Sequence, residues 1–79
     1  MTNQEILSRN PEFRYMLLSR MKSDCEFFLN HGARSTKCLW AGNVEEQISI
    51  MIDLYNSFES KPAWTSIEEI YEFKNLMKD

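Results

Sequence analysis

The sequence contains few residues that interrupt regular structure. Its 79 residues include only two Gly and two Pro, which favours helices joined by short loops. No apolar run is long enough to span a membrane, and the first residues lack the basic and apolar regions of a secretory signal. We therefore expect a cytoplasmic protein whose two cysteines are free thiols.

Residues suited to catalysis are equally scarce. The sequence has a single histidine, no glycine-rich phosphate-binding loop and no Ser/His/Asp motif. Cys25 or Cys38 would act as a nucleophile only if His31 reached it as a base, and so small a domain has little room for a substrate pocket. We expect a protein that is not an enzyme and that works by binding a partner.

The composition is that of one globular domain. Hydrophobic residues make up 43% of the chain and aromatic residues 13%, as in proteins that fold. The length allows a single helical domain over residues 1–79, with a core near the minimum size for stability. Residues 1–10 are expected to form a short flexible or helical N-terminal segment.

A first helix is predicted over residues 12–30. It follows Asn10 and Pro11, which suit a helix start, and ends before Gly32, which suits a helix end. Its core-facing residues recur every three or four positions and are Phe13, Leu17, Leu18, Met21, Cys25, Phe28 and Leu29. Residues 31–42 break this period and predict an ordered, aromatic-rich loop.

Two further helices follow this loop. One starts after Asn43, which has capping-box spacing to Glu46, and ends before Lys61-Pro62. The other opens with the same spacing between Thr65 and Glu68. Their core-facing residues are Val44, Ile48, Met51, Ile52, Tyr55 and Phe58, widened by Ile50 and Leu54, and then Ile67, Ile70, Phe73, Leu76 and Met77. The sequence thus predicts a small all-α, three-helix domain with the second helix at its centre.

Cys25, His31 and Cys38 are candidate zinc ligands. Thiolates and imidazoles are common zinc donors, and the three residues lie around the end of the first helix and the following loop. Zinc would tie the loop to the helix and stabilise so small a domain. A fourth donor would have to be Asp24, Glu26, water or a second chain. The alternative is that Cys25 is a small core residue and His31 a polar residue at a helix end.

Charge is distributed unevenly along the chain. Residues 1–42 contain six basic and four acidic residues, whereas residues 43–79 contain three basic and eight acidic residues. The acidic face expected on the last two helices consists of Glu45, Glu46, Asp53, Glu68, Glu69 and Glu72. Such a face either serves solubility alone or attracts a basic protein surface.

A basic and aromatic loop is a second candidate surface. Arg34, Lys37 and Trp40 lie in the predicted loop, where an aromatic ring with nearby cations can stack on a base or hold a phosphate. More often, such a tryptophan covers the core. The net acidic chain weighs against nucleic acid as the partner.

The first helix carries a third candidate surface. Met16, Arg20, Ser23 and Phe27 fall on one stripe away from its core face. Large apolar residues around an arginine make a plausible protein-binding anchor. The alternative is that Ile6 and Leu7 of the N-terminal segment cover the stripe.

Several short segments carry a resemblance to known domains. They are Asp24-Cys25-Glu26-Phe27-Phe28-Leu29, Gly32, Arg34, Lys37, Leu39-Trp40-Ala41-Gly42-Asn43, Leu54-Tyr55-Asn56-Ser57, Lys61-Pro62 and Trp64. Over most of residues 13–72 the chain resembles the large polyvalent protein-associated domain families. This resemblance implies a helical domain encoded by phages or conjugative elements, often inside a larger protein delivered with the invading DNA. It implies no reaction and no catalytic residue, and we expect this domain to stand alone.

A small acidic protein encoded by a mobile element could serve to block the defence systems of its host. By functional analogy we expect it to bind and inhibit a bacterial nuclease of the CRISPR type in the host cytoplasm. It would cover a surface that the nuclease needs for nucleic acid or for a conformational step. The alternative is an accessory nucleic-acid-binding module, with or without stabilising zinc, that acts during entry of phage or plasmid DNA.

Overall fold

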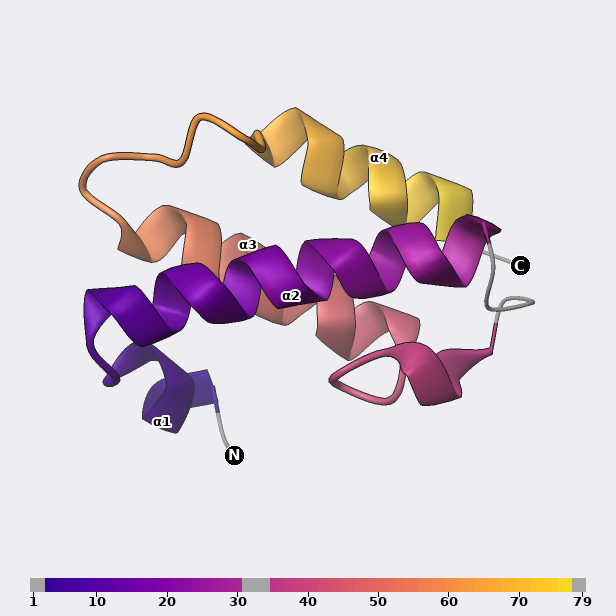
Figure 1. The fold of residues 1–79 in the computed structure, drawn as a ribbon, viewed down its shortest axis with the longest axis horizontal. Helices are drawn as coiled ribbons and strands as arrows, with labels where there is room; N and C mark the ends of the chain where they lie inside the picture. Colours follow the sequence, from indigo (N-terminus) through magenta and orange to yellow (C-terminus); the bar gives the residue numbers. More distant parts are fainter. Residues whose placement is uncertain (1–2, 31–34, 78–79) are drawn as a thin grey trace.

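The computed structural model describes residues 3–30 and 35–77, and within these ranges the chain forms helices and no strands. The elements are α1 (Asn3–Leu7), α2 (Pro11–Asn30), the 3-10 turn η1 (Thr36–Cys38), α3 (Val44–Ser57) and α4 (Ile67–Met77) (Figure 1). The three longer helices confirm the predicted all-α fold. None of the described helices combines the length and the apolar character needed to cross a bilayer.

Asparagine side chains start α2 and α3, as the sequence predicts. The Asn10 Oδ1 accepts a hydrogen bond from the backbone N–H of Phe13 at 2.8 Å. The Asn43 Oδ1 accepts one from the N–H of Glu46, also at 2.8 Å. Each bond satisfies a backbone donor that has no acceptor inside its own helix.

The start of α4 differs from the prediction by one residue. The side chain that accepts from the Glu69 N–H, at 3.1 Å, belongs to Ser66, so the prediction that Thr65 caps this helix is wrong. Thr65 is buried instead, and its hydroxyl donates to Glu69 Oε1 at 3.0 Å. Because serine and threonine both cap helices well, the burial of Thr65 decides which of the two does so.

Replacing Asn43 with Ala should lower the free energy of unfolding by about 1 kcal/mol, because the first turn of α3 loses its side-chain acceptor. Urea denaturation followed by circular dichroism measures the change. Asn56→Ala, at an exposed position of the same helix, is the control and should change stability by less than about 0.5 kcal/mol. Equal losses in the two variants would contradict a capping role for Asn43.

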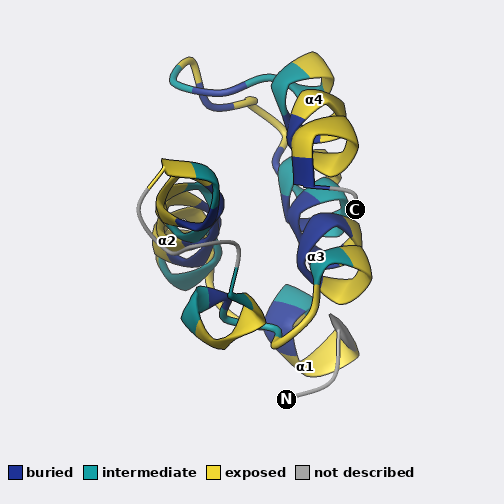
Figure 2. Cartoon of the chain, turned by 90° about the vertical axis from the view of Figure 1, so that its right-hand side faces the viewer, coloured by how far each residue is buried: buried dark blue, intermediate teal, exposed yellow. Residues whose placement is uncertain are grey.

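Helix α3 lies at the centre of the fold. It contacts α1, α2 and α4, which confirms the predicted central position. Figure 2 shows the buried faces of α2, α3 and α4 turned toward one another. The buried core consists of Ile6, Leu17, Leu18, Met21, Cys25, Phe28, Leu39, Ile48, Ile50, Met51, Leu54, Phe58, Ile70, Phe73 and Met77.

Leu76 is a predicted core residue that the structure places outside. It is 52% exposed. Ile70, Phe73 and Met77 define the buried side of α4, and Leu76 lies about 100° from Met77 around the helix axis. The prediction of a core position for Leu76 is therefore wrong.

The connection between α3 and α4 is fastened to α2. The Lys22 ammonium donates to the Trp64 carbonyl at 2.7 Å and pairs with Glu69 Oε1 at 3.0 Å. The Trp64 indole N–H donates to the Tyr15 hydroxyl, and the two rings meet edge to face at 5.3 Å. These contacts fix the side of α4 that turns toward α2, and with it the side that turns outward.

Candidate functional site

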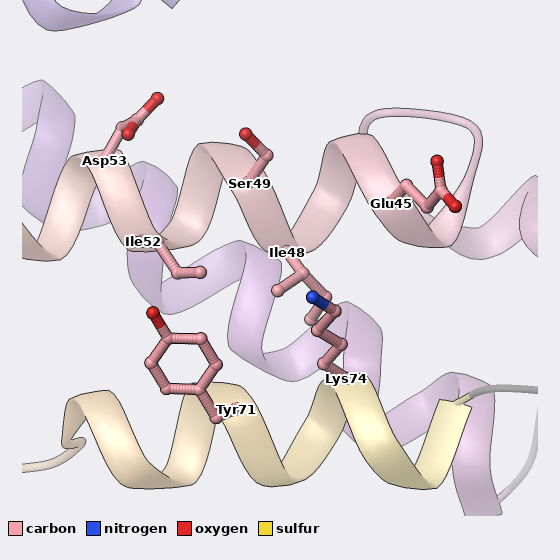
Figure 3. A pocket seen from close by; sticks show the side chains of 7 residues that line it. All are labelled: Glu45, Ile48, Ser49, Ile52, Asp53, Tyr71 and Lys74. Carbon is pink, nitrogen blue, oxygen red and sulfur yellow. The ribbon is translucent and has the colours of Figure 1, made fainter.

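A groove runs between α3 and α4, with α2 behind the pair (Figure 3). Its volume is about 410 Å³, and it is lined by Glu45, Ile48, Ser49, Ile52 and Asp53 of α3 and by Tyr71 and Lys74 of α4. The buried Ile48 and half-buried Ile52 supply apolar surface between the helices. The Tyr71 ring leans toward Ile52, and the Lys74 ammonium lies beside Ile48. The groove therefore combines an apolar centre with two carboxylates and one ammonium on its rim.

The fold divides the six acidic residues that the sequence predicts as one face. Glu45 and Asp53 line the groove, while Glu46, Glu68 and Glu72 are exposed on the same two helices. Glu46 does not line the groove. Glu69 lies on the opposite side of α4, where it pairs with Lys22. We call the groove, with Glu45 and Asp53, together with the exposed Glu46, Glu68 and Glu72 of the same two helices the acidic surface.

The stripe on α2 lies at the surface. Met16 is 67% exposed and Phe27 49% exposed, and Arg20 and Ser23 between them are exposed as well. The N-terminal segment does not cover Met16, because α1 packs against α3 and buries Ile6 there completely. Of the two alternatives that the sequence leaves open for this stripe, the structure favours exposure.

Trp40 lies next to this stripe. It is half-buried, and it lines a hollow of about 240 Å³ with Phe13, Met16, Leu17 and Arg20. Its backbone N–H donates to Asp24 Oδ2 at 3.1 Å, which ties the loop to α2. The structure thus brings Trp40 to Met16 and Arg20, although the sequence assigns them to different surfaces. Lys37 is exposed, and Arg34 lies outside the described residues.

The two thiols occupy different environments. Cys25 is completely buried, and its Sγ lies 3.6 Å from Met51 Sδ, in line with the alternative of a small core residue. Burial raises the pKa of the Cys25 thiol to about 12. The Cys38 thiol is half-buried and donates to the Ser35 carbonyl at 3.0 Å.

Zinc binding by Cys25, His31 and Cys38 stays a prediction. His31 lies outside the described residues, and among the described residues no three His, Cys, Asp or Glu side chains gather as a metal site. Elemental analysis of protein purified without an affinity metal tests the prediction, and stoichiometric zinc would support it.

Gln47 organises the loop that carries Trp40, and the sequence reasoning missed it. This side chain is completely buried. Its Oε1 accepts from the Ala41 N–H at 3.0 Å, and its Nε2 donates to the Met21 carbonyl at 3.2 Å. The available signal was a polar residue on the apolar face of α3, three residues after Val44 and four before Met51.

The chain is a small all-α domain with a groove between α3 and α4 and exposed apolar side chains on α2. Residues 11–77 match the large polyvalent protein-associated domain 11 family. The match covers most of the chain and all three long helices, so the chain belongs to this family of helical domains from large polyvalent, mobile-element proteins. This confirms the resemblance. Searches of curated proteins and of solved structures found no match.

Proposed function

We propose that this protein binds a host defence nuclease of the CRISPR type in the bacterial cytoplasm and inhibits it. The acidic surface is the binding site in this proposal. It occupies the basic groove with which such a nuclease holds nucleic acid, or a neighbouring surface that must move during the reaction. The protein needs no catalytic residue for this action, because occlusion alone stops the nuclease.

The observation that carries the proposal is the combination of charge and apolar surface between α3 and α4. Glu45 and Asp53 line the groove, and Glu68 and Glu72 are exposed on α4. Complementary charge speeds association with a basic surface and fixes its orientation. Tyr71, which is 48% exposed beside the groove, offers the kind of aromatic side chain that supplies affinity at interfaces. Membership of a mobile-element family gives such an inhibitor its biological setting.

Binding to nucleic acid is the rival function. One observation favours it: Arg20 and Trp40 line the same hollow, so a cation and an aromatic ring stand together as in sites that stack bases. Zinc at Cys25, His31 and Cys38 would be compatible with either function. The two functions make opposite demands on charge, since carboxylates attract a basic protein and repel a phosphate backbone.

Charge reversal at Glu45, Glu68 and Glu72 tests the proposal. The triple change to Lys should weaken binding to the nuclease by about tenfold or more, mainly through a slower association rate. Glu69 is left unchanged, because its pairing with Lys22 would confuse a loss of binding with a loss of stability. Surface plasmon resonance at low and physiological salt measures both rate constants against nucleases from hosts of the same element.

A control variant reverses two charges outside the acidic surface. Glu26→Lys and Glu59→Lys are exposed and lie outside the acidic surface, so they should leave binding within about twofold of the parent. Circular dichroism establishes that each variant is folded. Tighter binding of the triple variant to single-stranded DNA, with no nuclease binding by the parent, would favour the rival function.

A further inference from the structure

We propose that the outer face of α2 is a homodimer interface, in which two copies pair antiparallel about a two-fold axis at Met16. This inference does not depend on the proposed function, and it uses the face of the molecule opposite the acidic surface. Its starting point is the large exposure of Met16, 67%, on a helix whose other side is packed against α3 and α4.

Two hollows flank Met16. One, of about 470 Å³, is lined by Pro11, Glu12, Tyr15, Met16 and Phe58. The other, of about 240 Å³, is the hollow with Trp40 and Arg20. Apart from Glu12 in the first and Arg20 in the second, the side chains that line them are apolar or aromatic. Because methionine is flexible and polarisable, it fills irregular apolar spaces well. Met16 of a second copy would thus pack into one of these apolar hollows, next to Met16 of the first copy.

Charge complementarity selects a second copy as the occupant. Glu12 and Arg20 each lie four residues from Met16, so the three side chains form one ridge along α2. Both charged residues are exposed. Within residues 3–30 and 35–77, neither Glu12 nor Arg20 forms a salt bridge.

The register of the pair follows from this spacing. Four residues of α-helix span about 6 Å, so Glu12 and Arg20 are equally far from Met16 in opposite directions. A two-fold axis at Met16 places Glu12 of one copy opposite Arg20 of the other, and symmetry repeats the contact. A parallel pair would instead bring like charges together. Ridges of this spacing interdigitate at a crossing angle of about −50°, which seats each Met16 in a hollow of the other copy.

The dimer would leave both acidic surfaces exposed, because α2 lies behind the groove (Figure 3) and its outer face points away from α3 and α4. A single crossing of two helices buries less surface than a standard stable interface. We therefore expect weak association, with a dissociation constant on the order of 10–100 μM.

Sedimentation equilibrium from about 10 μM to 1 mM, a range that spans the expected affinity, tests the inference. The average mass should rise from 9.4 kDa toward twice that value. Glu12→Arg and Arg20→Glu should each weaken dimerisation by about tenfold or more, because each creates two like-charge contacts. An equimolar mixture of the two variants should regain dimerisation, because the mixed pair has opposite charges at both contacts.

Glu26→Arg is the matched control. It makes the same charge change at an exposed position of α2 outside both hollows, so it should dimerise as the parent does. A parent chain that stays monomeric at 1 mM overturns the inference. So does a dimer that neither single variant weakens, or single variants whose mixture stays monomeric.

Discussion

Replacing Gln47 with Leu lowers the free energy of unfolding by about 3 kcal/mol, because leucine keeps most of the side-chain volume but removes one buried and one part-buried hydrogen bond. The Ala41 N–H loses its acceptor at Gln47 Oε1, and the Met21 carbonyl loses a donor. An unsatisfied buried donor costs about 1–3 kcal/mol. The loss should therefore exceed that expected for the helix cap at Asn43.

The same substitution should release the loop that carries Trp40. That loop is held by two side chains, Gln47 at Ala41 and Asp24 at the Trp40 N–H. Urea denaturation gives the free energy, and two-dimensional NMR of the indole N–H groups reports on Trp40 separately from Trp64. The control is Gln4→Leu, at an exposed position of α1. A stability loss no larger than that of the control would contradict the bridging role of Gln47.

Local signals made most of the fold predictable from the sequence. The asparagine caps of α2 and α3 act within one turn of their own helix, so the residues that form them are close in sequence. The apolar spacing of α2 gave its buried face for the same reason. The sequence predicts the cap of α4 one residue too early, because Thr65 and Ser66 can both cap a helix and only the structure shows that Thr65 is buried and that Ser66 accepts from the Glu69 N–H.

The candidate surfaces were less predictable, because they depend on which elements meet. By its spacing in the sequence, Glu69 belongs with the acidic residues of α4. In the structure, however, its side chain forms an ion pair with Lys22 of α2 and lies apart from them. The exposure of Met16 depends on where α1 packs. From the sequence, α1 could cover either α2 or another helix, and in the structure it packs against α3. The contact of Trp40 with Arg20 likewise depends on the path of the loop. Asp24 and Gln47 fix that path through hydrogen bonds to Trp40 and Met21 that join residues distant in sequence.

Stability should also fall steeply above pH 9, and Cys25 supplies the reason. Desolvation by burial raises the pKa of its thiol from 9.0 to about 12, although the hydrogen bond with the Gln47 side chain acts in the opposite direction. The folded protein therefore keeps the proton up to about pH 12, while the unfolded chain releases it near pH 9. Below pH 9 the protonated Cys25 thiol makes its full contribution to the free energy of unfolding. It declines by about 1.4 kcal/mol per pH unit as the pH rises toward 12, because the unfolded state then binds fewer protons.

Cys25→Ala separates this effect from the titration of lysines and tyrosines, which both chains share. Between pH 8.5 and 10.5 the parent should lose about 2 kcal/mol more stability than Cys25→Ala, measured by urea denaturation under reducing conditions. The variant starts from a lower stability because it leaves a small cavity beside Met51, so the comparison concerns the change with pH and not the absolute value. Parallel losses in the two chains would mean that the thiolate is tolerated in the folded core, and that Cys25 is less well shielded from water than its burial indicates.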